Sequence, residues 1–160
     1  MAYVDGPAKP VAGAHDTKDC PFCVIPSLGD AEGLVVARGT HAYVVLNKYP
    51  YNTGHVLVCP YRHVGDYADL EDAELVEMAQ HTQTAVRVLR ESYGAHGVNL
   101  GMNLGAVAGA GITGHVHQHA VPRWSGDAHF LPIVAQTKSL PELLGSTRER
   151  LAAAWPGAEG

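Results

Sequence analysis

Three histidines, His115, His117 and His119, stand at alternate positions in one short segment. In an extended strand, alternate residues project from the same face, so the three imidazoles would lie side by side. Burying three polar rings on one face carries a desolvation cost that core packing alone does not explain. Two kinds of chemistry fit the pattern: a metal site, or a phosphate-handling site in which an imidazole is a base or a nucleophile.

Two cysteines, Cys20 and Cys23, have the two-residue separation that lets both thiolates reach one metal ion. They supply only half of a tetrahedral shell, so a metal site needs two more ligands from elsewhere. A pair of free thiols in a loop is the alternative interpretation. No β-α-β pattern surrounds the pair, which disfavours a thioredoxin-like redox motif. The third cysteine, Cys59, lies in an apolar run and is expected to be a small core residue.

Length and composition predict one globular unit. With 160 residues, 46% of them hydrophobic, the chain can form one sizeable core, and we expect a flexible leader over 1–19 and a single domain over 20–160. A formal net charge of -5 gives no basic field for a nucleic-acid polymer. No apolar run reaches the roughly 18 residues that a membrane helix needs, and no signal peptide is visible. We therefore expect a cytoplasmic protein with no membrane partner.

Apolar periodicity predicts a mainly antiparallel α+β fold. The runs Leu34–Arg38 and His41–Leu46, rich in Val and Tyr, are typical of a hairpin, and Val56–Cys59 of a third strand. From Glu71 to Ser92, apolar residues recur at three- and four-residue steps, which predicts one long helix with Asp69 as its N-cap.

The second half of the chain predicts two more strands and a helix. Val98, Leu100 and Met102 alternate with smaller residues, and the glycine-rich segment Gly105–Gly114 separates them from a strand that carries the three histidines. A final helix is expected to start at Ser139, with Glu142 completing a capping box, and to end at Pro156-Gly157.

Further residues surround the histidines in a fixed order: Asn47, Gly54-His55-Val56-Leu57-Val58, Asn103-Leu104-Gly105, and Val121-Pro122-Arg123. This order resembles the histidine triad (HIT) family of nucleotide hydrolases and transferases, from about Cys20 to Trp124. The run from Pro122 to Phe130 is similar to the prokaryotic branch that includes diadenosine tetraphosphate phosphorylases. The resemblance implies a HIT-like fold with a five-stranded sheet, one long helix and a C-terminal helix.

The resemblance also implies an enzyme that cleaves an adenylyl phosphoanhydride bond of a dinucleoside polyphosphate, with water or phosphate as acceptor. His117 is expected to be the nucleophile that forms a covalent nucleotidyl-histidine, because an imidazole with a pKa of about 6.5 is unprotonated at neutral pH. His55 and His119 are expected to contact the phosphate oxygens, and His119 also to orient His117.

Nucleotide contacts follow from the same resemblance. Asn47 is expected to bind the ribose, Asn103 to add an amide donor, and Gly105 and Gly111 to belong to a segment that wraps the phosphates with backbone N–H groups. Trp124 either stacks on the nucleotide or anchors the C-terminal part of the chain. Contacts to the base are expected from apolar residues of the first strands: Leu34, Val36 and Leu46.

Family members with an N-terminal cysteine pair complete a structural zinc site, and the matching residues here are His63 and His115. The expected zinc ligands are Cys20, Cys23, His63 and His115. A closed four-ligand site leaves no open position for water, so metal-assisted hydrolysis is not expected. Family members generally pair two five-stranded sheets across a two-fold axis, and a homodimer is the expected assembly.

Two other functions stay open at this point. One is a nucleoside phosphoramidate hydrolase or nucleotide-tailoring enzyme of the same fold, and the other is a nucleotide-binding signalling module without significant turnover. Two residues depart from the family pattern. Gln118 replaces an apolar residue on the opposite face of the histidine strand, where its amide needs partners on the long helix or at a subunit interface. Gly111 stands near the place of a phosphate-contacting Ser.

Overall fold

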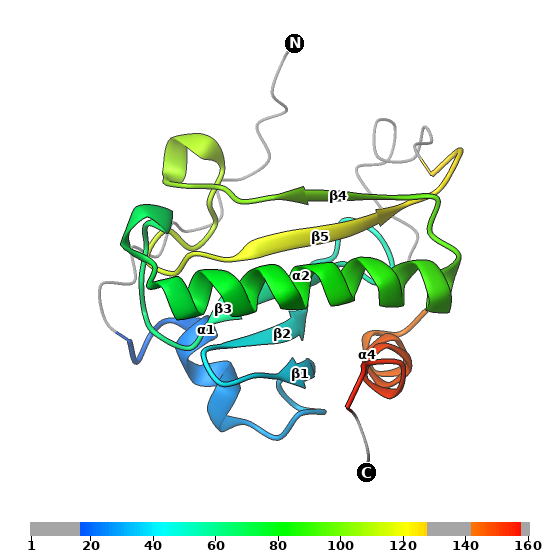
Figure 1. Ribbon diagram of the computed structural model, residues 1–160, viewed down its shortest axis with the longest axis horizontal. Coiled ribbons are helices and arrows are strands. Elements are labelled where there is room, and N and C mark those ends of the chain that lie inside the picture. Colours follow the sequence, from blue (N-terminus) through cyan, green and yellow to red (C-terminus); the bar gives the residue numbers. More distant parts are fainter. Residues whose placement is uncertain (1–16, 128–141, 158–160) are drawn as a thin grey trace.

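The computed structural model describes residues 17–127 and 142–157, and these ranges form a five-stranded antiparallel sheet with flanking helices (Figure 1). The elements are α1 (Pro21–Val24), η1 (Ile25–Ser27), β1 (Val35–Arg38), β2 (Ala42–Leu46), β3 (Val56–Pro60), η2 (Tyr67–Asp69), α2 (Asp72–Tyr93), β4 (Gly97–Gly101), η3 (Ala106–Ala108), β5 (Gln118–Arg123) and α4 (Leu144–Ala153). Of the expected leader, 17–19 form a turn and the rest lies outside the described ranges. No helix in those ranges is long and apolar enough to cross a membrane.

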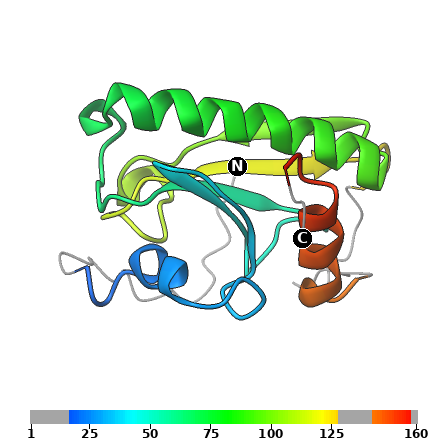
Figure 2. The same ribbon diagram turned by 60° about the horizontal axis from the view of Figure 1, so that its bottom comes forward.

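The sheet has the strand order β1-β2-β3-β5-β4, and every neighbouring pair is antiparallel. Helix α2 lies along one face, over β2, β3 and β5, while α1 lies on the other side of the sheet (Figure 2). Helix α4 packs against β1 and α2. The predicted α+β class, with one long helix and a C-terminal helix, is confirmed.

Every residue of β2 and β3 is buried, because both faces of these strands are covered. Val44 and Val58 belong to the core under α2, whereas Tyr43 and Cys59 belong to a second cluster with Phe22 of α1. This double burial explains why the two strands read as continuous apolar runs rather than as alternating patterns. The expectation that Cys59 is a core residue is confirmed.

Helix α2 begins later than predicted. Glu71, not Asp69, is its N-cap, and the Glu71 backbone N–H donates to the Glu74 carboxylate in a capping box. Asp69 is instead the last residue of η2, and its carbonyl accepts a hydrogen bond from Arg62. The helix ends at Tyr93 and is capped by Gly94, whose φ of 59° is left-handed.

The apolar positions of α2 form two adjacent faces, not the single predicted stripe. Met78 and Leu89 are buried in the core under the helix. Thr82 and Val86 line a groove between α2 and β4, and Leu75 and Met78 contribute to both the groove and the core. The helix therefore carries more apolar surface than its own sheet covers.

Strand ends differ from the expected bounds by a residue or two. Leu34, His41 and Met102 lie just outside the strands assigned to them. The histidine strand differs most, because β5 begins only at Gln118. Before it, the Val116 N–H donates to the carbonyl of Val64 rather than to a neighbouring strand. His115 and His117 thus lie in the segment that leads into the sheet.

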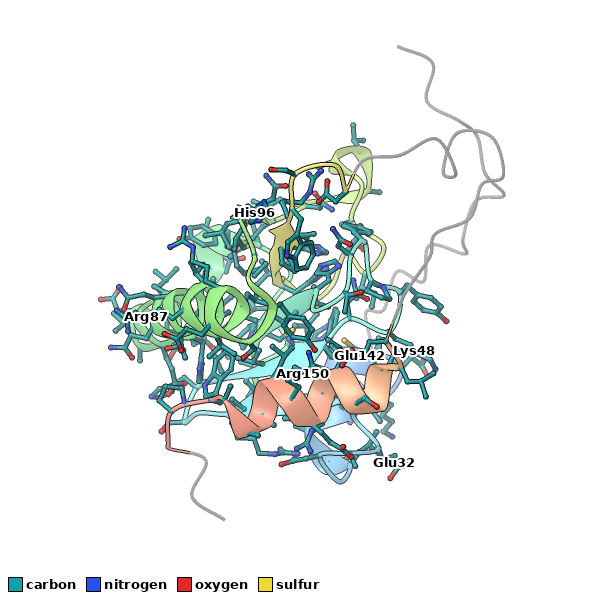
Figure 3. All side chains as sticks on the ribbon, turned by 90° about the vertical axis from the view of Figure 1, so that its right-hand side faces the viewer. Glu32, Lys48, Arg87, His96, Glu142 and Arg150 are labelled. Atoms are coloured by element: carbon teal, nitrogen blue, oxygen red, sulfur yellow. The ribbon has the colours of Figure 1, made fainter. Side chains whose placement is uncertain are left out.

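The C-terminal helix begins at Leu144, and Ser139 lies outside the described ranges. The expected capping box is wrong, because Glu142 precedes the helix. Its carboxylate accepts hydrogen bonds from the hydroxyls of Tyr93 and Thr147 and so ties the start of α4 to the end of α2. Figure 3 shows Glu142 and Arg150 close together at α4, where they form an ion pair of 3.0 Å.

Candidate active site and metal centre

Antiparallel pairing of β3 with β5 brings the histidines together. His55 immediately precedes β3, and His119 is the second residue of β5, opposite Leu57. Because Val56 and Ala120 belong to the core under α2, the alternation of the strands places His55 and His119 on the other face. The ring of His117 lies beside that of His119, with 5.0 Å between centroids. The three residues expected to be catalytic are therefore adjacent.

A chain of hydrogen bonds runs through two of these rings. The Tyr51 backbone N–H donates to Nδ1 of His55 at 3.0 Å, so that nitrogen must be an acceptor and the ring proton must sit on Nε2. His55 Nε2 lies 2.9 Å from Nδ1 of His119 and donates to it. The remaining His119 proton is then on Nε2, a buried atom with no hydrogen-bond partner among the described residues. His119 therefore offers a donor for an oxygen that the protein itself does not supply.

The tautomer of His117 is fixed in the opposite sense. Its Nδ1 lies 2.9 Å from the backbone carbonyl of His115, which can only accept, so Nδ1 carries the proton. Its Nε2 therefore keeps a lone pair. The site combines a nucleophilic nitrogen on His117 with a hydrogen-bond donor on the adjacent His119.

Burial keeps these imidazoles uncharged at neutral pH. Desolvation lowers the pKa of His117, although its bond to the His115 carbonyl acts in the opposite direction. Desolvation, with a smaller contribution from the nearby His117, lowers the pKa of His119 to about 4. A ring that is neutral at pH 7 can attack phosphorus without first losing a proton.

Asn47 lies between the histidines and an apolar cavity. Its side-chain amide is 3.3 Å from Nδ1 of His55, and its carbonyl oxygen accepts from the Tyr49 N–H. The cavity, of about 350 Å³, is lined by Phe22, Leu34, Leu46, Asn47 and Lys48, among others. Two of the expected base contacts line it, whereas Val36 lies in the core under α2 and does not.

The other predicted nucleotide contacts, Asn103, Gly105, Gly111 and Trp124, do not line this cavity. Asn103 donates to the Gly109 carbonyl at 3.5 Å, and Gly105 and Gly111 are exposed on the same segment. Trp124 donates its indole N–H to the Tyr93 carbonyl and lines a separate cavity with Arg150 of α4. This contact agrees with the anchoring interpretation of Trp124.

Cys20, Cys23, His63 and His115 meet in one cluster, with their potential ligand atoms all within 4.8 Å of one another. Nδ1 of His115 lies 3.4 Å from the Cys20 sulfur, and Nδ1 of His63 lies 3.2 Å from the Cys23 sulfur. A tetrahedral zinc ion with bonds of about 2.0 to 2.3 Å separates its ligand atoms by about 3.3 to 3.8 Å. Nε2 of His115 also lies 2.9 Å from the Pro60 carbonyl, which orients Nδ1 toward the sulfurs.

The Cys23 thiol of this cluster needs a nearby cation to ionise at neutral pH. Burial, and secondarily a hydrogen bond to Cys20, raise the pKa of Cys23 to about 11. Without a metal, Cys23 therefore stays a thiol at neutral pH, whereas a bound metal ion favours its deprotonated form. The donor set and its spacing fit a structural zinc site.

Two contributors to the site were not predicted from the sequence. The sequence pattern gives Tyr51 no role, yet its ring lies against both His55 and His119. Phe22 lies between the cysteines in sequence, and its ring contacts those of His115 and His117. The aromatic type of both residues, next to turn formers and cysteines, was the only available signal.

The HIT domain model matches residues 29–126 of the chain. The sequence is 47% identical to the AP-4-A phosphorylase of Mycobacterium tuberculosis H37Rv, over 97% of this chain and 80% of that protein. It is 36% identical to an uncharacterized HIT-like protein of Methanocaldococcus jannaschii, over 70% and 84%. Among solved structures, a Zn-bound histidine triad family protein from Mycobacterium smegmatis superposes with a TM-score of 0.70 at 26% identity, over 87% of this chain and 94% of that one.

The lowered pKa of His119 predicts a pH-dependent stability. Since the unfolded chain binds this proton more tightly, the folded state loses stability as the pH falls from 6.5 toward about 4. The glutamine of His119→Gln does not titrate. Between pH 7 and pH 5, the free energy of unfolding should therefore fall by about 1 kcal/mol more in the wild type than in this variant, after allowance for a partly exposed ring. Urea unfolding at both pH values measures this. His96→Gln, which replaces an exposed histidine, is the control. The prediction is contradicted if the difference in free energy of unfolding between wild type and His119→Gln is the same at both pH values.

Proposed function

The chain belongs to the HIT domain family, and we propose that it cleaves dinucleoside polyphosphates through a covalent nucleotidyl-histidine formed on His117. The observation that carries this proposal is the hydrogen bonding of two adjacent rings, from which we infer opposite tautomers. His117 presents a lone pair on Nε2, and His119 presents a proton on its own Nε2. An attacking nitrogen beside a donor for phosphate oxygen is the minimum that phosphoryl transfer to an imidazole requires.

In the first step, Nε2 of His117 attacks the α-phosphorus of the adenylyl group. An N–P bond forms, and the P–O bond to the rest of the polyphosphate breaks, with the electron pair leaving on that oxygen. The positive charge that develops on the ring of His117 is shared with Nδ1–H, which already donates to the His115 carbonyl. His119 stabilises the charge on the phosphate oxygens through Nε2–H.

In the second step, an oxygen of the acceptor attacks the same phosphorus and the N–P bond breaks, which returns the lone pair to His117. Water gives AMP, and inorganic phosphate gives ADP. The 47% identical AP-4-A phosphorylase of M. tuberculosis supports phosphate as the acceptor. The phosphate contact expected of His55 is not part of this proposal, because both of its ring nitrogens are engaged within the protein. His55 acts through His119 instead.

Nucleotide binding is proposed for the surface around the histidines. Asn47 stands at the border between His55 and the apolar cavity, which suits a ribose contact with the base inserted among Leu34 and Leu46. The segment with Asn103, Gly105 and Gly111 is proposed to approach the phosphates. Trp124, held by its hydrogen bond to the Tyr93 carbonyl, is proposed to contact the part of the nucleotide farthest from Asn47.

We also propose that Cys20, Cys23, His63 and His115 hold a structural zinc ion. When bound, the ion ties the N-terminal segment to the chain that leads into β5, and four protein ligands leave no position for a reacting water. The Zn-bound family member from M. smegmatis supports this assignment. Paired thiolates persist in a reducing compartment, so we propose a cytoplasmic location.

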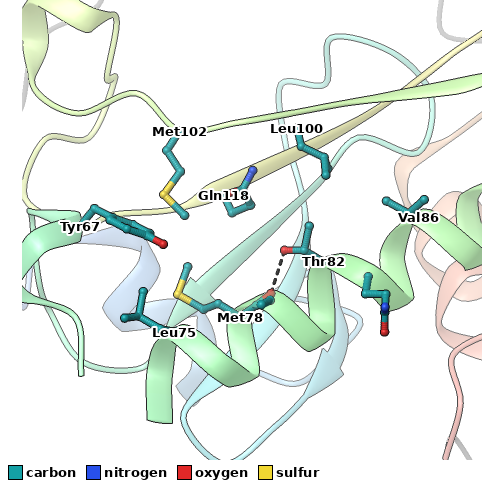
Figure 4. A pocket seen from close by; sticks show the side chains of 10 residues that line it. Tyr67, Leu75, Met78, Thr82, Val86, Leu100, Met102 and Gln118 are labelled. Carbon is teal, nitrogen blue, oxygen red and sulfur yellow. Dashed lines mark hydrogen bonds between the residues drawn. The ribbon is translucent and has the colours of Figure 1, made fainter. Parts of the chain in front are cut away.

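A homodimer is proposed from the groove between α2 and β4. This groove, of about 330 Å³, is lined by Tyr67, Met78, Leu100, Met102 and Gln118, among others (Figure 4). Leu100 is 51% exposed on β4, and no strand of the described chain pairs with the outer edge of β4. A second copy could continue the sheet there and cover the apolar side chains. Gln118 lines this groove, and its amide donates to the His119 carbonyl rather than to α2, so it would lie close to the interface.

Product analysis of diadenosine tetraphosphate turnover tests the proposed reaction. ADP and ATP should form only when inorganic phosphate is added, and His117→Ala should reduce turnover at least about a thousandfold because the nucleophile is lost. His96→Ala, which removes an exposed histidine, is the control. AMP formed without phosphate would identify a hydrolase. No turnover by the wild type would contradict the proposal and direct the search to adenosine phosphoramidate.

Metal analysis of the purified protein tests the zinc site. The wild type should hold one zinc ion per chain, and Cys23→Ser should lose it together with thermal stability, because three ligands bind far more weakly than four. Cys59→Ala is the matched control, since Cys59 lies outside the cluster and should leave the zinc content unchanged. Equal zinc in wild type and Cys23→Ser rules out this ligand set.

Light scattering coupled to size-exclusion chromatography tests the dimer. The wild type should elute with twice the chain mass of 16.9 kDa, and Leu100→Glu should be monomeric because a carboxylate would be buried at the interface. Val76→Glu places the same charge on α2 at a residue that is 57% exposed and outside the groove, so it should stay dimeric. Dissociation by both variants, or by neither, would argue against this surface.

A further inference from the structure

Tyr51 covers two rings of the histidine site. Its ring is nearly parallel to that of His119, with 8° between the planes and 5.8 Å between centroids. It also lies 4.7 Å from the centroid of the His55 ring, at 40°. Tyr51 is itself 54% exposed, so it stands between these imidazoles and the surface. One aromatic face thus contacts both members of the hydrogen-bonded histidine pair.

The backbone of the same residue sets the direction of that pair. The Tyr51 N–H donates to His55 Nδ1, which directs the His55 proton to His119 and the His119 proton into the site. Tyr51 is therefore connected to His119 at two points, through its backbone amide by way of His55 and through its ring.

Hydrogen bonds of the neighbouring Asn52 to residues at the C-terminal end of β5 hold Tyr51 in position. The side-chain amide of the next residue, Asn52, donates to the Pro122 carbonyl and to the Asp127 carboxylate. Asp127 is held in turn by two hydrogen bonds from Arg123 and one from the Trp124 N–H. These contacts give a structural role to the Arg123 and Asp127 positions, which the proposed chemistry does not use.

We propose that Tyr51 is a positioning residue for nucleotidyl transfer, whose stacked ring holds His119 with Nε2 aimed at the reacting phosphate, and that the contact between Asn52 and Asp127 holds Tyr51 in place. This inference rests on the proposed function. An imidazole has a broad, nearly two-fold preference about its second side-chain torsion, so its hydrogen bond to His55 alone leaves it free to tilt. A flat ring against its face restricts that motion and excludes water from it.

The stacking contact matters most when charge develops on the phosphate, so its loss should lower kcat more than it changes KM. Tyr51→Leu keeps apolar bulk but removes the flat face, and kcat should fall about three- to tenfold, the range expected for one aromatic contact. Tyr51→Phe keeps the ring and should stay within about twofold of wild type. Asp127→Asn, which weakens the contact with Arg123 and Asn52, should resemble Tyr51→Leu in direction.

Nitrogen NMR of the histidine rings, recorded on the protein without nucleotide, gives a readout that is independent of turnover. The titratable groups of the described chain that face His119 are His55, His117 and Tyr51. In Tyr51→Leu, water reaches the exposed face of the ring, so the His119 pKa should rise toward its ordinary value and the single tautomer should give way to a mixture. Tyr51→Phe should keep the wild-type tautomer and pKa.

Two results overturn the inference. One is a His119 signal that Tyr51→Leu leaves unchanged, whatever the turnover. The other is a changed signal together with wild-type kcat, which makes the contact merely structural. A wild type that does not cleave the dinucleotide refutes the proposed function instead, and kcat and KM are then compared on adenosine phosphoramidate. If neither substrate is turned over, the positioning role is overturned as well. Thermal unfolding of each variant confirms that the compared proteins are folded.

Discussion

The hydrogen bond between His55 Nε2 and His119 Nδ1 is the contact on which the site depends. It exists only because β3 and β5 pair with Leu57 opposite His119, which sets the two rings on one face. A shift of one residue in that pairing would turn His119 toward α2 and leave a polar ring in the apolar core. The pairing that buries Val56 and Ala120 under α2 therefore also fixes which atom of His119 points into the site.

The segment from His115 to His117 connects the proposed zinc site with the proposed nucleophile. The side chain of His115 turns to the two cysteines, while its backbone carbonyl fixes the tautomer of His117. The Phe22 ring packs against the rings of His115 and His117. The Phe22 carbonyl accepts a hydrogen bond from the hydroxyl of the buried Tyr43. The segment from Cys20 to Cys23 thus packs against the histidine site, although it contributes no group to the proposed reaction. A zinc ion bound by this segment would therefore support the site without taking part in the proposed reaction.

Strand β5 presents different surfaces with successive residues. Gln118 points toward the groove between α2 and β4, while His119 points to the opposite face of the sheet. Helix α2 carries apolar side chains for both its own core and that groove, which is why its sequence pattern is broader than a single buried stripe. The surface proposed to meet a second copy and the surface proposed to bind nucleotide are therefore built from the same strand, and the period of two along the strand keeps them apart.

The sequence alone determined the fold class, the long helix and the residues of the triad, because spacing and periodicity are local properties that one strand or helix expresses directly. It also indicated the family, through the order of Asn47, His55 and the three histidines. Only the tertiary structure decided the proton arrangement of His117 and His119, the contact of Tyr51 with two histidines, and the start of β5 after His117. All three features depend on contacts between residues that are far apart in the sequence or on backbone groups, such as Val64 and the Tyr51 N–H. A local sequence pattern does not predict such contacts. The true N-cap of α2 was missed for the same reason, since Arg62 holds Asp69 outside the helix.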